Sequence, residues 1–251
     1  MTLRILDTFS GIGGFSLAAM WLGGFETVQF VEVDPFCRRV LRKHWPDTPI
    51  HQDICNFRPK PGSADVIVGG FPCQDISNAG KQRGIKEGTR SGLFYELMRV
   101  IRLVRPQYVV LENVAAIRGA GGGVDTVLGE LAEAGYDCEW ACIKASDVGA
   151  IHERDRFWAV AYPIGHGSQG NMQQAFPWQS ALQRVESVRG FTDLRERPAP
   201  CTPRLLRGTD GLPYKLDRLR AVGNAVVPHV AMIPLARVLE LELEHWRADH
   251  P

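Results

Sequence analysis

The sequence predicts an α/β fold in which parallel strands alternate with helices, and three observations carry this prediction. Residues 4–7 form a short apolar run that leads directly into a glycine-rich turn and a helical pattern. Residues 66–68 form another apolar run, which ends in Gly69-Gly70. Acidic side chains stand at the ends of further predicted strands. Such runs are typical of buried parallel strands, and open α/β sheets bind ligands at the carboxyl ends of their strands.

Length and composition narrow the class of protein. A chain of 251 residues can bury one substantial core and carry a small appended lobe. The 29 Lys and Arg residues balance 28 Asp and Glu residues, so any surface that attracts a polyanion must be local. We expect no signal peptide and no membrane span, because no apolar run has the required length. The six cysteines lack zinc-site spacing, which favours free thiols in a reducing cytosol.

The first predicted strand is followed by the sequence DTFSGIGGFSLAAM. Gly11 and Gly13 permit a tight turn close to a ligand, and residues 15–22 continue as a helix. Strand, glycine turn and helix form a nucleotide-type binding unit. Ser16 stands where the dinucleotide motif has its third glycine, so the loop by itself is also consistent with an ordinary turn.

Acidic residues follow the next two predicted strands. Glu32 and Asp34 lie at the end of residues 27–33, where a carboxylate is placed to bind ribose hydroxyls. We assign Asp34 to the cap of the helix that begins at Pro35, which leaves Glu32 for the ribose. Asp53 follows the next short strand and is placed to accept a hydrogen bond from an adenine amino group. Together these strand ends predict an adenosine site.

The run that ends in Gly69-Gly70 exposes the sequence FPCQ at residues 71–74. Cys73 is thereby placed as a nucleophile would be, although a small buried thiol is the alternative. Residues 81–105 hold seven basic and two acidic side chains, and the first half of this run is rich in glycine. This pattern predicts either a loop that closes on a polyanionic substrate or a solvated loop. An apolar stripe over residues 93–104 predicts a helix.

Charged residues also follow the next strands. Glu112 ends the strand predicted at 107–111 and would face the same cleft as Cys73, where exclusion of water suits a carboxyl group to donate a proton. A cap for the next helix is the alternative. Residues 137–143 and 157–162 predict an antiparallel pair. Arg154 and Arg156 lie between them, two positions apart, and either hold a phosphate or carbonyl oxygen from one face or serve as surface charge.

Residues 163–212 interrupt this pattern with prolines, glycines and little periodicity. Six arginines interleaved with aromatic residues suit contact with nucleic acid, and a solvated loop is the alternative. The chain then returns through a predicted Gly223-Asn224 turn to a C-terminal helix that begins near Pro228. We interpret residues 163–212 as a small, irregular insert in one α/β domain.

Six ordered blocks resemble those of DNA (cytosine-5)-methyltransferases: DTFSGIGGFSLA, VEVD, GGFPCQDIS, LENV, HERDR and AVGNAVVP. The resemblance implies a Rossmann-like sheet, mostly parallel with one antiparallel strand, that uses S-adenosylmethionine. It implies a catalytic domain at residues 1–162 plus 213–251 and a target-recognition insert at residues 163–212. The implied partner is double-stranded DNA. We further expect a monomeric bacterial or phage-encoded protein in the cytoplasm, with no metal and no membrane association.

The same resemblance assigns roles to individual positions. Cys73 would be the nucleophile, Glu112 the proton donor, and Arg154 and Arg156 would support the flipped base. The residues expected to line the cofactor are Phe9, Gly11, Gly13, Glu32, Asp53, Pro72, Leu93 and Asn224. An RNA-directed cytosine-5 methyltransferase is the nearest alternative, but its Cys-Phe-Thr signature is absent. A nicotinamide oxidoreductase would leave Cys73 and Glu112 unexplained, and a non-catalytic DNA-binding relative would need neither.

Overall fold

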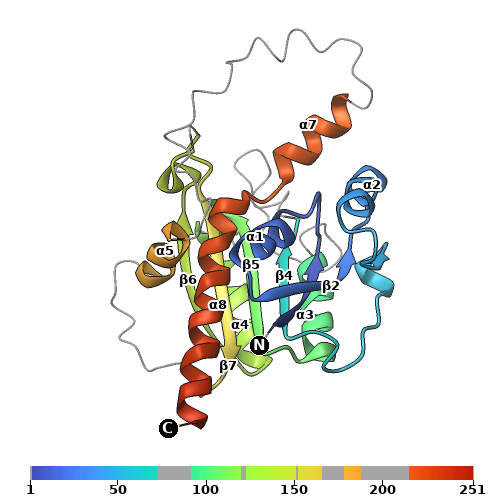
Figure 1. Cartoon of the computed structure of the whole chain (residues 1–251). Coiled ribbons are helices and arrows are strands. Elements are labelled where there is room, and N and C mark those ends of the chain that lie inside the picture. The colour runs from blue at the N-terminus through green and yellow to red at the C-terminus, as the bar shows by residue number, and fades with distance from the viewer. Residues whose placement is uncertain are drawn as a thin grey trace.

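The computed structural model describes residues 2–72, 92–119, 123–150, 152–165, 178–187 and 215–250. Its described strands form one sheet in the order β3-β2-β1-β4-β5-β7-β6 (Figure 1). The strands are β1 Leu3–Thr8, β2 Phe25–Val31, β3 Ile50–His51, β4 Val66–Gly70, β5 Tyr108–Val114, β6 Tyr136–Ile143 and β7 Arg156–Pro163. Parallel pairing joins β3 through β5, whereas β7 is antiparallel to both β5 and β6. The mostly parallel sheet with one antiparallel strand is therefore confirmed.

The strand order reverses its direction between β1 and β4. From β1 the chain moves outward to β2 and β3, and it then returns to place β4 on the other side of β1. Loops that leave the carboxyl ends of two such neighbouring strands diverge and open a crevice, which is the usual ligand site of these sheets. The glycine-rich loop after β1 and the Phe71-Pro72 segment after β4 both start at this position.

Helices cover both faces of the sheet (Figure 1). The helices are α1 Gly14–Leu22, α2 Pro35–His44, α3 Leu93–Val104, α4 Val124–Glu133, α5 Gln179–Glu186, α7 Lys215–Asn224 and α8 Pro228–Asp249, with short 3-10 turns η1 Ile54–Asn56, η2 Ala115–Arg118 and η3 Ala145–Val148. The buried residues of α1, α5 and α8 pack on one face of the sheet, and those of α3 and α4 pack on the other. Two apolar layers therefore enclose the central strands.

Local signals explain several element boundaries. The Asp34 carboxylate accepts hydrogen bonds from the backbone N–H groups of Phe36 and Cys37, and Pro35 opens α2, so the predicted cap is confirmed. In α3 the expected apolar stripe is buried against β4 and β5. Gly135 follows α4 with a φ of 91°, a conformation that suits glycine at a helix end.

The C-terminal region differs from the sequence prediction. Gly223 and Asn224 are the last residues of α7, so the change of direction falls at residues 225–227 rather than at a Gly223-Asn224 turn. Residues 220–248, over α7 and α8, are the one helical stretch among the described residues that is long and apolar enough to cross a membrane, and 44% of its apolar part is buried in the fold. Since the buried side of α8 packs against α1, α5 and the sheet, it serves as a core helix.

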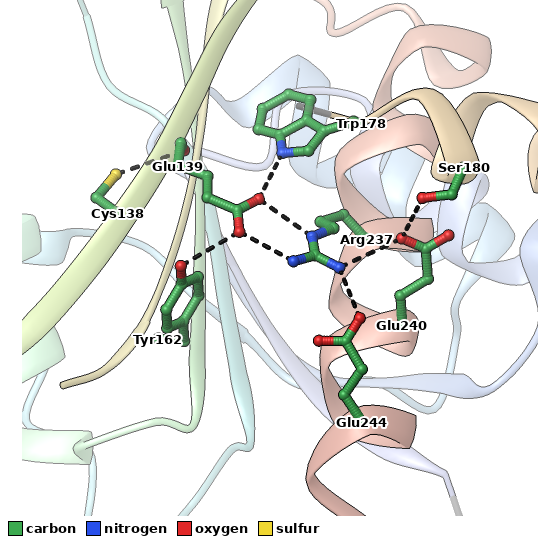
Figure 2. Close-up of polar contacts among 8 residues, drawn as sticks. All are labelled: Cys138, Glu139, Tyr162, Trp178, Ser180, Arg237, Glu240 and Glu244. Atoms are coloured by element: carbon green, nitrogen blue, oxygen red, sulfur yellow. Dashed lines mark hydrogen bonds and ion pairs between the residues drawn. The ribbon is translucent and has the colours of Figure 1, made fainter. Parts of the chain in front are cut away.

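A polar network fastens α5 and α8 to the outer strands (Figure 2). The Glu139 carboxylate on β6 accepts four hydrogen bonds, from Tyr162 Oη, Trp178 Nε1, Arg237 Nε and Arg237 Nη2, at 2.9 to 3.2 Å. Arg237 also contacts Glu240 and Glu244 within α8. Trp178, which directly precedes α5, is fully buried. Residues 178–187, part of the predicted insert, thus pack on the main body of the protein.

Candidate active site

The loop after β1 bends sharply and lies on the Glu32 carboxylate. Phe9, Gly11 and Gly13 have φ values of 50°, 54° and 87°. The backbone N–H of Gly11 donates to Glu32 Oε2 at 2.7 Å, and that of Asp34 donates to Glu32 Oε1 at 2.7 Å. Burial raises the pKa of Glu32, and these two N–H groups oppose the rise. Glu32 therefore fixes the glycine loop to the end of β2.

The glycine loop is tightly packed at one position and open at another. A Cβ atom at Gly13 would lie 2.7 Å from the Trp45 ring, whereas one at Gly11 would meet no atom of the described residues within 4 Å. The space beside Gly11 and the Glu32 carboxylate next to it fit an adenosine ligand, whose ribose hydroxyls need an acceptor. Asp53 lies after β3, is half-buried and accepts a hydrogen bond from the backbone N–H of Cys55 at 2.9 Å.

Asp7 and Ser16, on either side of this loop in the sequence, are hydrogen-bonded to each other. The sequence pattern did not predict this contact. Ser16 Oγ donates to Asp7 Oδ2 at 2.6 Å, and Ser10 Oγ donates to the backbone carbonyl of Asp7 at 2.6 Å. Burial raises the pKa of Asp7 to about 7. The serine at the third motif position therefore serves as a hydrogen-bond partner for a buried acid. In the sequence, only the presence of Asp7, Ser10 and Ser16 within one short stretch signals this arrangement.

Glu112 is held at the end of β5 by an arginine. Its carboxylate Oε1 lies 3.0 Å from Arg156 Nε, and its side chain is 14% exposed. Burial raises the pKa of Glu112, and the charges of Arg156 and then Arg154 oppose the rise. Gly70 is its neighbour on β4, and Trp158 is its neighbour on β7. The alternative of a helix cap does not apply, because Glu112 lies within the strand.

Arg154 and Arg156 contact different groups. Arg156 is the first residue of β7, whereas Arg154 precedes the strand with a φ of 33°. The prediction that both project from one strand face is therefore wrong. Arg154 Nη1 donates to the carbonyl of Gly223 at 2.9 Å, and its Nη2 donates to that of Ala225 at 2.6 Å. Burial and the charge of Arg156 lower the pKa of Arg154.

The Phe71-Pro72 segment leaves the sheet beside Glu112. Gly70 is paired with Glu112, and Asn113 Nδ2 donates to the carbonyl of Phe71 at 3.3 Å. Asn113 is 2% exposed, so this contact is shielded from water. Asn113 belongs to the LENV block, but the sequence pattern alone assigns it no role. Cys73 and the predicted basic loop lie outside the described residues.

The remaining predicted positions lie around the same edge of the sheet. Leu93 begins α3, and its side chain packs with that of Phe9 against one apolar cluster. Asn224 ends α7 and is exposed. Within the described part of the chain, no three His, Cys, Asp or Glu side chains gather as a metal site requires. The described candidates thus lie at the carboxyl ends of the parallel strands or on the segments that flank those ends.

Comparison with known proteins identifies relatives of the chain. Residues 3–198 match the sequence model described as "C-5 cytosine-specific DNA methylase". Type II methyltransferase M.AquIA of Picosynechococcus sp. is 31% identical over 232 residues, which cover 81% of this chain and 92% of the relative. Type II methyltransferase M1.ScrFI of Lactococcus lactis subsp. cremoris is 35% identical over 162 residues, which cover 63% of this chain and 41% of the relative.

The solved structure of Entamoeba histolytica methyltransferase EhMeth has the same fold, with a TM-score of 0.63 and 14% identity over 96% of this chain and 98% of that one. The chain spans less than half the length of several curated relatives that it matches. The match to the family sequence nevertheless extends over more than three quarters of the chain. By its sequence, its sheet topology and its ordered motifs, this chain belongs to the C-5 cytosine-specific DNA methylase family.

Proposed function

We propose that this chain transfers the methyl group of S-adenosylmethionine to carbon 5 of a cytosine in double-stranded DNA. The observation that carries the proposal is the Glu112–Arg156 pair beside the strand end from which Phe71 and Pro72 leave the sheet. This is a largely buried carboxyl group with a raised pKa, next in space to the segment that leads into Cys73. Family membership supports the choice of cytosine and of DNA.

The glycine loop and the acids beside it would hold the cofactor. Glu32 would accept hydrogen bonds from the ribose hydroxyls, and Asp53 would accept one from the adenine amino group. The space beside Gly11 supports a ligand against this loop. The side chains of Phe9 and Leu93, with Pro72 and Asn224, would complete the lining. When bound, S-adenosylmethionine supplies an electrophilic methyl group on a sulfonium.

Cytosine carbon 5 is too weak a nucleophile to accept that methyl group unaided. The thiolate of Cys73 would add to carbon 6, forming a carbon–sulfur bond and moving the ring electrons toward carbon 5. Glu112 would donate its proton to ring nitrogen 3, so that negative charge does not accumulate on the ring. After methylation, loss of the carbon 5 proton to water breaks the carbon–sulfur bond and releases Cys73, and ring nitrogen 3 returns its proton to Glu112.

The target base must leave the DNA stack before Cys73 can reach it. Extruding a base from a duplex costs a few kcal/mol, and contacts to the flipped base and the phosphates must offset that cost. Arg156, through its ion pair, would keep Glu112 aimed at the ring. The basic side chains of the loop at residues 80–92 would bind phosphates, and residues 163–212 would form the target-recognition insert. We expect the protein to act on cytoplasmic DNA as a monomer.

Bisulfite sequencing of DNA from cells that express the protein tests this function. We expect cytosines in a defined sequence context to resist conversion, and we expect Cys73→Ala to abolish the resistance while leaving calorimetric binding of S-adenosylmethionine within about threefold of wild type. Full conversion of DNA from cells with abundant folded wild-type protein would exclude the function. Protection confined to RNA would identify the RNA-directed alternative instead.

A further inference from the structure

The Arg154 side chain is hydrogen-bonded to the backbone where α7 ends and the segment leading to α8 begins. Its two terminal nitrogens donate to the carbonyls of Gly223 and Ala225, at 2.9 and 2.6 Å. These carbonyls lie on either side of Asn224, which we expect to line the cofactor. A planar guanidinium that bridges two carbonyls fixes both their spacing and their direction. Arg154 therefore sets where the last turn of α7 ends.

The backbone at Arg154 is strained, which indicates that its contacts are specific. A φ of 33° lies in the left-handed region, where a residue with a side chain pays of order 1 kcal/mol or more. Such a conformation persists only where surrounding contacts hold it. The half-buried guanidinium and its two carbonyl partners are contacts of this kind.

The same segment also touches the residue that directly follows the glycine loop. A Cβ atom at Gly14 would lie 2.7 Å from the backbone carbonyl oxygen of Val226 and 3.1 Å from the Val226 Cβ. Gly14 is the first residue of α1 and directly follows Gly13 of the loop. Residues 223–226 therefore contact both Arg154 and the first residue after the loop that we expect to bind the cofactor.

Arg156, two positions along the chain, holds Glu112 instead. One short segment thus contacts the carboxyl group of the base site and the backbone beside the cofactor site. Resting on the proposed function, we propose that Arg154 is a positioning residue for the cofactor site: it clamps residues 223–225 against the glycine loop and ties that loop to the segment that carries Arg156. Contact with the flipped cytosine belongs to Arg156 and Glu112.

Three variants test whether Arg154 serves the cofactor site and Arg156 the base site: Arg154→Gln, Arg154→Lys and Arg156→Gln. Calorimetry measures the Kd for S-adenosylmethionine alone, and initial rates on DNA give kcat and the cofactor KM. We expect Arg154→Gln to raise Kd and KM at least about tenfold while kcat changes less than about threefold. Lysine can still donate to a carbonyl, so Arg154→Lys should recover part of the affinity. Arg156→Gln should lower kcat about a hundredfold with Kd unchanged.

Gly14→Ala displaces the same segment through its contact with Val226 and should also raise the cofactor Kd, so it decides the question if Arg154→Gln does not fold. Arg102→Gln, at an exposed ion pair with Glu130, is the matched control and should leave Kd and kcat unchanged. An Arg154→Gln protein with wild-type Kd and a kcat as low as that of Arg156→Gln would overturn the proposal. Wild-type protein that binds the cofactor but methylates no DNA would refute the proposed function alone, and the variants' Kd values would still judge Arg154.

Discussion

Gly70→Ala is expected to separate catalysis from stability, because of where its added methyl group would lie. A Cβ atom at Gly70 would be 2.9 Å from Glu112 Oε2, and ordinary contacts begin at 3.4 Å. The carboxylate must therefore move by about 0.5 Å, the difference between these two distances. The atom in the way is the end of a flexible side chain, so the movement requires no shift of the backbone.

The displaced carboxylate also loses its aligned contact with Arg156, which is 3.0 Å in the wild type. Misplacing a reacting group by 1 Å can cost about a hundredfold in rate, so half that distance predicts a loss in kcat of roughly tenfold. Folding stability should change by less than about 1 kcal/mol, which corresponds to about 2–4 °C in Tm for a chain of this size. Initial rates on DNA and thermal unfolding monitored by circular dichroism measure the two quantities.

Gly129→Ala is the matched control, because a Cβ atom at this position of α4 would meet no atom within 4 Å in the part of the chain that the structure describes. It should keep wild-type kcat and gain about 0.5–1 kcal/mol in stability, since alanine favours the helix more than glycine does. A Gly70→Ala protein with kcat within twofold of wild type would refute the placement of Glu112 in the reaction. A Tm lower by more than about 8 °C would refute the argument that the carboxylate yields without backbone movement.

Further predictions concern stability and DNA binding. Folding raises the pKa of Asp7 from 3.8 to about 7. The protonated carboxyl group therefore contributes its full stabilisation of the folded state below about pH 4, and this contribution should be lost as the pH rises to about 7. Between about pH 5 and pH 8, ionisation of Asp7 should lower the free energy of unfolding of the wild-type protein by about 3 kcal/mol. Urea titrations of Asp7→Asn should not show this loss. Arg237→Met should cost about 3 kcal/mol, and adding Glu139→Gln should restore much of it. Neutralising Arg83 and Arg90 should weaken DNA binding and lower its salt dependence by about one to two in log–log slope.

Each of these predictions has a contradicting result. An equal pH dependence for wild type and Asp7→Asn would show that the buried acid does not titrate in this range. Additive losses in the Arg237→Met, Glu139→Gln pair, measured by chemical denaturation, would show that the two charges do not depend on each other. Unchanged affinity in the Arg83 and Arg90 double variant, measured by fluorescence anisotropy at two salt concentrations, would exclude the basic run from the DNA interface.

Features that depend on residues close in the sequence could be predicted from the sequence. The cap at Asp34 needs only Pro35 and the two N–H groups that follow, and it is confirmed. The acid at Glu32 and the carboxyl group at Glu112 follow from strand ends, because parallel strands bring those ends to one edge of the sheet. Cys73, outside the described residues, stays a prediction.

Features that depend on partners far away in the sequence could not be predicted. Arg154 leaves the strand because its guanidinium binds carbonyls 69 and 71 positions further along the chain. Trp178 is buried because its indole N–H reaches Glu139, 39 positions away, and this contact places a helix where the sequence pattern indicated irregular structure. Proline and glycine content predicts loops, but it carries no information about which loop residues find a partner on the sheet.

The central claim is that Cys73 bonds transiently to a flipped cytosine beside a bound methyl donor. The most direct measurement uses a duplex library in which 5-fluorocytosine replaces cytosine, because fluorine cannot leave as the carbon 5 proton does. With S-adenosylmethionine present, a protein–DNA adduct should persist through denaturing electrophoresis, map to Cys73 by peptide mass spectrometry and be absent from Cys73→Ala. Folded, cofactor-bound wild-type protein that forms no adduct, or forms one through another residue, would contradict the account.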